Sequence, residues 1–401
     1  MTGRDGVQPR PRPEALRVLQ LIPSLEKGGA ERLVLDACRE LGQRPDVLVR
    51  LVTLSEANAY PSLTAEIDWR VAPGRFAPSV RGKGVRNLDR LRAEMLAFRP
   101  HVVHSHLFAA EMASREIRYA GPAYFTHGHN EMPELAGASW TMLRSKRRLT
   151  NYYERLWLLR RYRELGNHFL AVSRMVQRFF ESVLPGDLRR VTLLPNAVSL
   201  ERFRFSGERH PSGTVWRLVS VGSLLPNKNH VFLVEVVAEL VRRARPVVLT
   251  LLGEGPCRGP ITERARALGV SERVRLSGAV ENVEQELKDQ HLYVHAARRE
   301  SFGLTLIEAM AGGLPVVCLD GGGNAELMEE GRNGFLLPEP DVAAFAGRVE
   351  CALTDEPYYQ ALASGARRGA EAFDMRTYAG RLLAIYEDAV GRAQERDRDA
   401  G

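Results

Sequence analysis

Cysteine is scarce in this 401-residue chain, which contains four cysteines that stand far apart. They form no CxxC pair and are not spaced with histidines in the way that zinc ligands are; they are Cys38, Cys257, Cys318 and Cys351. A disulfide framework or a zinc-binding module needs closely spaced ligands or paired cysteines. Neither is therefore expected here.

Long apolar runs are also absent. No stretch approaches the roughly 20 consecutive apolar residues that a membrane-spanning helix needs. The first residues are rich in proline and arginine and lack the apolar run of a signal peptide. We therefore expect a cytoplasmic protein, acting at most at the inner face of the cell membrane.

Positive charge is in excess, and it is unevenly distributed. Of the 56 Lys+Arg and 49 Asp+Glu, residues 1–200 hold 31 and 20, which leaves 25 and 29 for residues 201–401. The first half thus carries +11 and the second half −4. A basic surface attracts any polyanion, so charge alone does not distinguish nucleic acid, an anionic membrane and an acidic substrate.

Short runs rich in Val, Leu and Ile alternate with helical patterns throughout the chain, which is typical of an α/β protein with parallel sheets. The alternation restarts after the polar stretch 204–213, which indicates a linker between two doubly wound, Rossmann-like domains. We expect a flexible leader over 1–14, an N-terminal domain over 15–203, a C-terminal domain over 204–374, and a terminal helix over 375–393. This helix is expected to cross back to the N-terminal domain.

The segment ARRESFGLTLIEAMAGG is the most informative one, because it predicts a strand end, a loop and a helix in quick succession. The backbone amides of Phe302, Gly303 and Leu304 would be free donors at the start of the helix, where the helix dipole also favours an anion. A diphosphate fits such a site. Glu308 lies ~8 Å further along the helix at ~1.5 Å per residue, which suits a carboxylate that binds the ribose of the same nucleotide.

Two other loops follow predicted strands. Lys228, in VGSLLPNKNH, lies where the first strand of the second domain leads into a helix, and ligand groups of doubly wound folds lie at such strand ends. Its ammonium group would neutralise a diphosphate. Gly28 and Gly29 occupy the matching junction of the first domain, where glycine lets the backbone approach a phosphate or a sugar closely.

These motifs, taken in order, resemble the retaining nucleotide-sugar glycosyltransferases of family four, which have the GT-B fold. The most specific match is the E-x7-E pattern from Glu300 to Glu308 with the following AMAGGLPVV and GGGNAELMEEGRNGFLL. GGAER, LPNAVSLERF and VGSLLPNKNH occur in the order that this family shows. The resemblance covers nearly the whole chain.

The resemblance implies a transfer of a hexose-type sugar, with retention, from a nucleotide diphosphate sugar held mainly by the second domain. UDP is the favoured nucleotide. Glu300 would contact the sugar hydroxyls, Glu308 the ribose and Lys228 the diphosphate, and His127 would reach toward the donor sugar. The catalytic residues are expected to be His127, Lys228 and Glu300; the expected donor-binding residues are Gly28, Gly29, Lys228, Glu300, Ser301, Phe302, Gly303, Leu304 and Glu308. No cofactor and no metal are expected.

The chain departs from the family pattern at one of the cationic phosphate contacts. Ser223 stands where the family often has an arginine, in VGS rather than VGR. We expect Arg298 or Arg299 to supply the missing positive charge.

The acceptor is expected to bind the basic first domain and to be a glycan or a lipid-linked saccharide, in the assembly of an extracellular polysaccharide or a cell-envelope glycan. The stretch 141–164 has eight Lys+Arg and two Asp+Glu among tyrosines, leucines and a tryptophan. It would suit an anionic membrane surface, or it could be an ordinary helix with a solvated basic face. No nucleic-acid-binding module is recognisable.

Three alternatives to this function remain open at the sequence level. One is a transferase that acts on a small-molecule acceptor, and another is a catalytically silent nucleotide-sugar-binding subunit. A nucleotide-sugar epimerase on the same scaffold is the third.

The histidines of HVVHSHL and FTHGHN also raise a metal site as an alternative to polar groups that line a cleft, but no carboxylate or cysteine cluster accompanies them.

Overall fold

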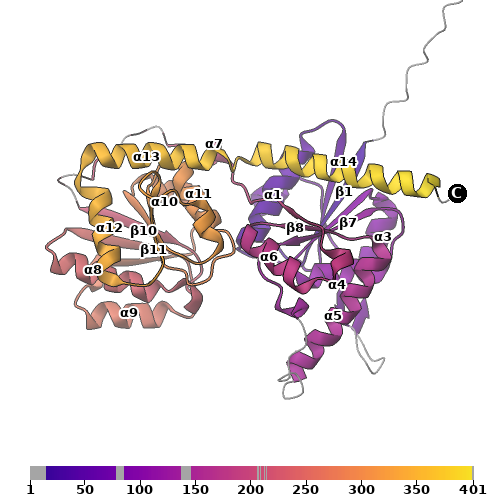
Figure 1. Ribbon diagram of the computed structural model, residues 1–401, viewed down its shortest axis with the longest axis horizontal. Helices are drawn as coiled ribbons and strands as arrows, with labels where there is room; N and C mark the ends of the chain where they lie inside the picture. The colour runs from indigo at the N-terminus through magenta and orange to yellow at the C-terminus, as the bar shows by residue number, and fades with distance from the viewer. Residues whose placement is uncertain are drawn as a thin grey trace, which may run out of the picture. The chain divides into compact units, whose positions relative to one another are not determined.

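The computed structural model describes residues 15–77, 85–136, 146–205, 207, 209–211, 213 and 215–399. The expected leader and the first part of the basic stretch, 141–145, lie outside these residues. The described chain contains two parallel sheets with helices on both faces (Figure 1), which confirms the expected pair of doubly wound domains. Backbone contacts divide the chain into two compact units, one formed by 1–125, 164–167 and 385–401 and the other by 126–163 and 168–384.

The first sheet has seven strands in the order β3-β2-β1-β6-β7-β8-β9. Its strands are β1 (Leu16–Ile22), β2 (Val47–Thr53), β3 (Trp69–Val71), β6 (Val102–His106), β7 (Ala123–Gly128), β8 (His168–Ala171) and β9 (Val191–Leu193). A small antiparallel pair, β4 (Arg75–Ala77) and β5 (Val85–Asn87), stands apart from it. The connecting helices are α1 (Gly29–Gly42), α2 (Pro61–Thr64), α3 (Asp89–Phe98), α4 (Phe108–Ile117), α5 (Lys146–Leu165), α6 (Arg174–Val183) and α7 (Leu200–Phe203).

The second sheet has six strands in the order β12-β11-β10-β13-β14-β15. Its strands are β10 (Trp216–Val221), β11 (Val247–Leu252), β12 (Val274–Gly278), β13 (Leu292–His295), β14 (Val316–Leu319) and β15 (Gly334–Leu337). Its helices are α8 (His230–Arg242), α9 (Arg258–Ala267), α10 (Val283–Lys288), α11 (Leu304–Ala311), α12 (Val342–Thr354) and α13 (Glu356–Glu371).

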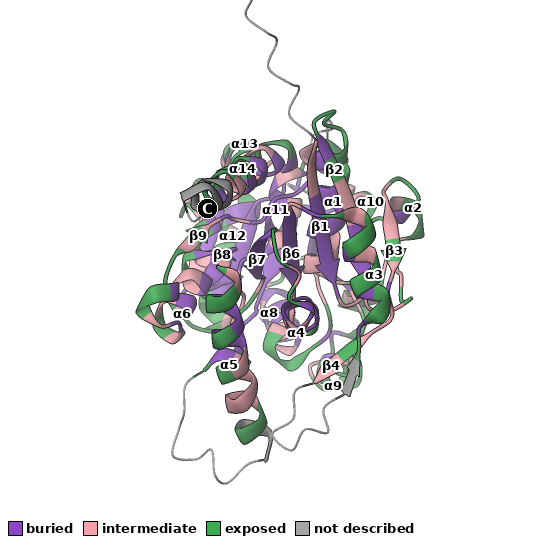
Figure 2. Ribbon diagram, turned by 90° about the vertical axis from the view of Figure 1, so that its right-hand side faces the viewer, coloured by how far each residue is buried: buried purple, intermediate pink, exposed green. Residues whose placement is uncertain are grey.

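The apolar runs form these strands because helices cover both faces of each sheet. All residues of β6, β7, β13 and β14 are buried, as expected for parallel strands that need apolar side chains on both faces. Figure 2 shows buried strands and helices whose outer faces are exposed. The alternation of helical and apolar segments in the sequence therefore predicts parallel sheets covered by helices on both faces.

The last helix, α14 (Met375–Asp399), extends beyond the expected residues 375–393. Tyr386 on this helix is fully buried, and its hydroxyl accepts a hydrogen bond from Gln20 Nε2 of β1 at 2.9 Å. The same hydroxyl lies 2.5 Å from His104 Nδ1 of β6. The helix thus contacts the first sheet through Tyr386. No helix among the described residues is long and apolar enough to cross a membrane.

The polar stretch 204–213 includes one buried cation, Arg209. Its guanidinium donates hydrogen bonds to the carbonyls of Leu287 and Lys288 at the end of α10 and of Gly312 just after α11. Helix C-termini present such unpaired carbonyls and favour a positive charge. This part of the expected linker is therefore fixed to the second sheet's helices.

Both sheets use the same contact where their first strand begins. Arg17 is the second residue of β1, and its guanidinium lies 2.8 Å from Nε2 of His101. The His101 amide donates a hydrogen bond to the Arg17 carbonyl. In the second sheet, the Arg217 guanidinium lies 2.9 Å from Nε2 of His291, whose amide donates to the Arg217 carbonyl. Burial, with Arg217 and Arg209 nearby, lowers the pKa of His291 to about 4.

The stability of the protein should fall in mild acid because of such buried histidines. The pKa of His230 is also lowered to about 4, mainly by burial. The unfolded chain takes up these protons near the ordinary histidine pKa of ~6.5 and the folded chain does not. The stabilising contribution of each neutral ring is thus fully present above this pKa and is lost as the pH falls toward 4. We expect the midpoint of thermal unfolding to decrease over this range.

His291→Gln should lower the midpoint at pH 7 but weaken its dependence on pH in this window. His210→Gln is the control, since the His210 side chain is 60 % exposed. An equally steep pH dependence in His291→Gln and wild type would contradict the assignment.

Candidate functional site

The candidate site lies where the strand order of the second sheet reverses. β10 is the first strand of this sheet in sequence, and it lies between β11 and β13. Ligands of doubly wound folds bind at the carboxyl ends of strands at such a switch point. Lys228 belongs to a short 3-10 turn, η4 (Pro226–Lys228), which follows β10, and Glu300 belongs to the loop after β13. The topology therefore places both residues at one edge of the sheet.

Lys228 and Glu300 form an ion pair. Lys228 Nζ lies 2.6 Å from Glu300 Oε2, and the side chains are 24 % and 14 % exposed. His295, the last residue of β13, places its Nε2 3.4 Å from the same carboxylate oxygen. Burial opposes the ionisation of Glu300, but His295 and Lys228 together hold the pKa of this carboxyl at about 2. Glu300 is thus an anion in a largely enclosed position.

Three consecutive glycines fix the backbone at Glu300. The Glu300 amide donates to the carbonyl of Gly321 at 2.8 Å, and the Gly323 amide donates to the carbonyl of Glu300 at 2.8 Å. A Cβ atom at Gly323 would lie 2.0 Å from the Ser301 carbonyl oxygen. The loop that carries Glu300 therefore depends on the absence of a side chain at Gly323.

Helix α11 begins beside this pair. Gly303 precedes the helix with φ of +101°, in the left-handed region that favours glycine. The amides of Phe302, Gly303 and Leu304 make no recorded hydrogen bond within the described part of the chain, as expected for the start of a helix. These amides are therefore available to an anion, and the Lys228 ammonium, paired with Glu300, lies at the same edge of the sheet.

Tyr293 of β13 contacts the first turn of α11. The Tyr293 hydroxyl donates to Thr305 Oγ1 at 2.7 Å and lies 3.3 Å from the carbonyl oxygen of Val221 at the end of β10. Burial raises the pKa of Tyr293 above its ordinary value, so the hydroxyl stays protonated and can donate. Tyr293 thus ties the helix start to both strands of the switch point. Glu308, one turn further along α11, is half-buried.

The departure at Ser223 leaves an exposed serine in the loop after β10. Of the two arginines expected to replace the missing cation, Arg299 is 67 % exposed and forms an ion pair with Glu131. The backbone amide of Arg298 donates to the carbonyl of Asn227, next to Lys228. The charge of Arg299 is thus balanced by Glu131 in this structure, whereas the Arg298 backbone joins the two loops of the switch point.

Gly28 and Gly29 belong to the other compact unit, at the start of α1. The hydroxyl of Tyr60 lies within 3.3 Å of both the amide and the carbonyl of Gly28. A Cβ atom at Gly28 would lie 2.2 Å from Oε2 of Glu31. A carboxylate beside this helix start disfavours the binding of a phosphate at these glycines.

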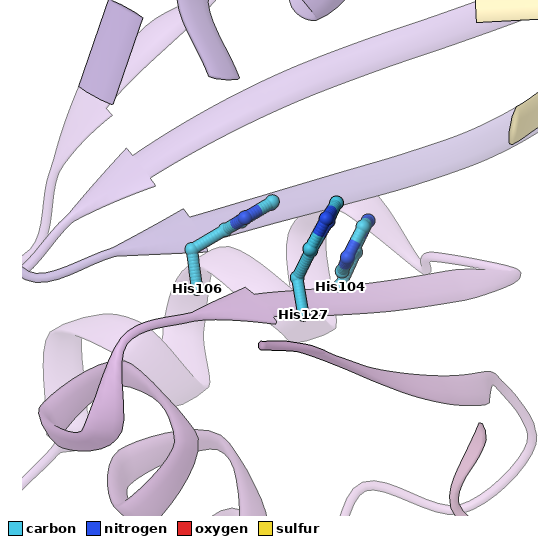
Figure 3. Close-up of side chains that lie close together, drawn as sticks. All are labelled: His104, His106 and His127. Carbon is cyan, nitrogen blue, oxygen red and sulfur yellow. The ribbon is translucent and has the colours of Figure 1, made fainter. Parts of the chain in front are cut away.

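The remaining expected residue, His127, lies near the carboxyl end of β7 and is buried. Its ring stacks on that of His129, with centroids 4.5 Å apart. Nitrogen atoms of His104, His106 and His127 lie within 4.8 Å of one another (Figure 3). His106 Nε2 is 2.7 Å from Gln20 Oε1, so His104 and His106 each have one ring nitrogen in a hydrogen-bond network with Gln20 and Tyr386. His104, His106 and His127 are therefore buried side chains of two central strands of the first sheet.

The contributions of His295, Tyr293 and Gly323 were missed by reasoning from the sequence. A histidine or tyrosine within an apolar strand has no recognisable spacing to a glutamate beyond a loop. The glycine run GGGNAE was visible, but its backbone pairing with Glu300 depends on the fold. Only the alternation of strand and loop at Ala296–Glu300 could have suggested that His295 lies near the carboxylate.

Comparisons with known proteins agree on one kind of enzyme. Residues 27–202 match the model described as "Glycosyltransferase Family 4", and residues 204–369 match "Glycosyl transferases group 1". The chain is 27 % identical over 322 residues to EpsF of Bacillus subtilis (strain 168), described as a glycosyltransferase, which covers 76 % of this chain and 79 % of that protein.

A second relative and a solved structure extend the comparison. The D-inositol 3-phosphate glycosyltransferase of Jonesia denitrificans is 31 % identical over 186 residues, 44 % of this chain and 43 % of that protein. The crystal structure of Anabaena Alr3699/HepE in complex with UDP-glucose has a TM-score of 0.74 and 19 % identity, and the match covers 93 % of this chain and 100 % of that chain. This likeness shows the same fold.

A methyl group at Gly323 should disturb the site and the stability together. Gly323→Ala would force Ser301 to move, and overpacking of this kind costs about 1–3 kcal/mol. Gly259→Ala on α9 is the control, because a Cβ atom there has nothing within 4 Å. Urea unfolding should show a clear loss for Gly323→Ala and a small gain for Gly259→Ala. Equal stability of Gly323→Ala and wild type would show that the loop relaxes freely.

Proposed function

The chain belongs to family four of the glycosyltransferases and has the GT-B fold, and from this premise we propose that it is a retaining, metal-independent hexosyltransferase that uses a UDP-sugar. The observation that carries the proposal is the Lys228–Glu300 pair beside the start of α11. A cation, free helix amides and an ionised carboxylate at one switch point match a diphosphate joined to a sugar.

Each group has a separate part in this proposal. Lys228 and the amides of Phe302, Gly303 and Leu304 bind the diphosphate and stabilise the negative charge that grows as it departs. Glu300 accepts hydrogen bonds from the sugar hydroxyls, and Glu308 accepts from the ribose. His127 contacts the donor sugar. The protein thus mainly positions the substrates and stabilises charge.

Retention follows from a substitution on one face of the sugar. The bond between the anomeric carbon and the phosphate oxygen breaks, and the bond to the acceptor oxygen forms on the same side. The acceptor proton passes to the departing phosphate oxygen. Glu300 is therefore a contact to the sugar, and no pair of carboxylates acts as nucleophile and acid in this scheme.

UDP is favoured because Alr3699/HepE, which has the same fold, was crystallised with UDP-glucose. Metal independence is favoured by the neutralising groups at the site. One ammonium and a set of helix amides supply the positive potential that a divalent cation supplies in other sugar-nucleotide enzymes. A metal at His104, His106 and His127 would be the contrary finding.

The proposed acceptor is a glycan or a lipid-linked saccharide, in the assembly of an extracellular polysaccharide or a cell-envelope glycan. The excess of positive charge in residues 1–200 supports an anionic or membrane-associated acceptor. A small-molecule acceptor is the second candidate. It is supported by the relative that is named a D-inositol 3-phosphate glycosyltransferase.

Contact with an anionic membrane through 141–164 is part of the proposal, and α5 supplies both support and a constraint. Leu149 and Leu156 lie two turns apart on this helix and are 50 % and 46 % exposed. Three of its arginines make contacts within the protein, however. Arg155 donates to the carbonyls of Leu135 and Val183, Arg161 is buried over Trp157, and Arg163 pairs with Asp187. Membrane contact would thus rely on the exposed leucines rather than on these three arginines.

Binding of nucleotides tests the donor site. We expect UDP and a UDP-sugar to raise the unfolding midpoint in the presence of EDTA as much as with Mg²⁺, since no metal takes part. Glu308→Ala should lower the affinity for UDP about tenfold, because a hydrogen bond to a charged group contributes about 1.5–3 kcal/mol. UDP should then raise the unfolding midpoint of this variant less than that of the wild type. GDP, ADP and TDP with their sugars complete the panel. Stabilisation that needs a metal, or none by any nucleotide, would contradict the proposal.

Sedimentation with vesicles tests the membrane contact. The wild type should sediment with vesicles that contain phosphatidylserine and stay in solution with neutral ones. Replacing Leu149 and Leu156 by serine should reduce this binding several-fold, because both lose apolar area that enters the interface. Leu96→Ser is the control, since Leu96 is 55 % exposed on α3. Wild-type protein that remains in the supernatant with anionic vesicles would exclude the contact.

A further inference from the structure

Two partners share one oxygen of the Glu300 carboxylate, and they differ in mobility. Lys228 has a long side chain, 24 % exposed, on a short 3-10 turn. The side chain of His295 is 3 % exposed and stands at the end of β13, which pairs with β14 and β10. A lysine can reorient toward a ligand at little cost, whereas the histidine ring is fixed by the packing around it.

The proposed donor site places a second demand on Lys228. A diphosphate at the start of α11 would attract the same ammonium group that pairs with Glu300. A buried carboxylate that loses its only close cation incurs a large desolvation cost. Some other group has to keep Glu300 ionised and oriented while the donor is bound.

His295 is the group in reach of Glu300 that is fixed in place. We propose that His295 is a positioning residue for the donor sugar: its Nε2–H holds Glu300 Oε2 when Lys228 turns to the diphosphate. This inference rests on the proposed function of the site. The 3.4 Å separation shortens to a hydrogen bond as the lysine leaves, as contacts in sites without substrate often do on binding.

The orientation of the carboxylate supports this role. The recorded contacts of the Glu300 side chain, within the described residues, involve Oε2 with Lys228 and His295. Oε1 would then be the oxygen that accepts a hydrogen bond from a sugar hydroxyl. Because His295 holds Oε2, it would also fix the position of Oε1. The site would then favour sugars whose hydroxyl groups can reach Oε1.

The groups around His295 favour a neutral ring before the donor binds. Burial disfavours a positive charge on His295, and so does the nearby ammonium group of Lys228. Glu300 acts in the opposite direction, and it lowers the cost of protonation once Lys228 has moved away. The neutral ring carries the Nε2–H that this role requires in the tautomer whose Nδ1 is unprotonated, and the protonated ring carries it as well.

The test compares UDP with UDP-glucose by titration calorimetry, because only UDP-glucose carries a sugar on its diphosphate. His295→Leu should leave the affinity for UDP within about twofold and weaken UDP-glucose about tenfold, the value of a hydrogen bond to a charged group. His295→Gln keeps an N–H at the position of Nε2 and should restore most of the loss. In the Glu300→Gln background, His295→Leu should have no further effect, since the histidine acts through the carboxylate.

The result separates this inference from the proposed function. If Lys228→Met weakens UDP but His295→Leu leaves the preference for UDP-glucose intact, the donor site stands and the role of His295 is wrong. If His295→Leu weakens both ligands equally, or weakens UDP-glucose further in the Glu300→Gln background, the residue has a general structural role instead. If the wild type binds neither ligand, both proposals fail.

Discussion

The site depends on one ion pair, the Lys228 ammonium on the Glu300 carboxylate, held at 2.6 Å in a largely enclosed position. Each charge would be costly there alone, because burial without a partner penalises an ion strongly. The rest of the site maintains the pair. The glycines at 321–323 fix the Glu300 backbone, His295 lies behind the carboxylate, and Tyr293 holds the adjacent helix start. A ligand that carries its own charge and hydroxyls can replace these contacts one by one, which makes the pair suitable for a sugar nucleotide.

The strand order of the second sheet brings Lys228 and Glu300 together. Lys228 and Glu300 are 72 residues apart, but they follow β10 and β13, which are neighbours in the sheet. The reversal of strand order between these strands opens space for a ligand at their carboxyl ends. At the opposite ends of the same two strands, Arg217 and His291 fasten the strand starts, and Arg17 with His101 repeat this contact in the first sheet. The carboxyl ends of the strands are thus left for binding, whereas the contacts at their opposite ends supply stability.

Much of this could be predicted from the sequence. The alternation of apolar runs and helices predicted two parallel sheets, and the E-x7-E motif predicted the start of α11 and the position of Glu300. The partners of these residues could not be predicted, because the contacts of His295, Tyr293 and Gly323 depend on how the loop after β13 folds against its neighbours. The fate of Arg299 was equally hidden, since its ion pair is with Glu131. Local pattern thus specifies elements and motifs, and packing specifies which side chains meet.

The most direct measurement is a crystal structure of the protein with UDP-glucose. The proposed donor site predicts diphosphate oxygens within hydrogen-bond distance of the Leu304 amide and of Lys228 Nζ, a sugar hydroxyl hydrogen-bonded to Glu300, and the ribose hydrogen-bonded to Glu308. Lys228 should have moved from Glu300 toward the diphosphate. A nucleotide bound elsewhere, or a diphosphate held by a metal at His104, His106 and His127 with the Lys228–Glu300 pair unchanged, would contradict it.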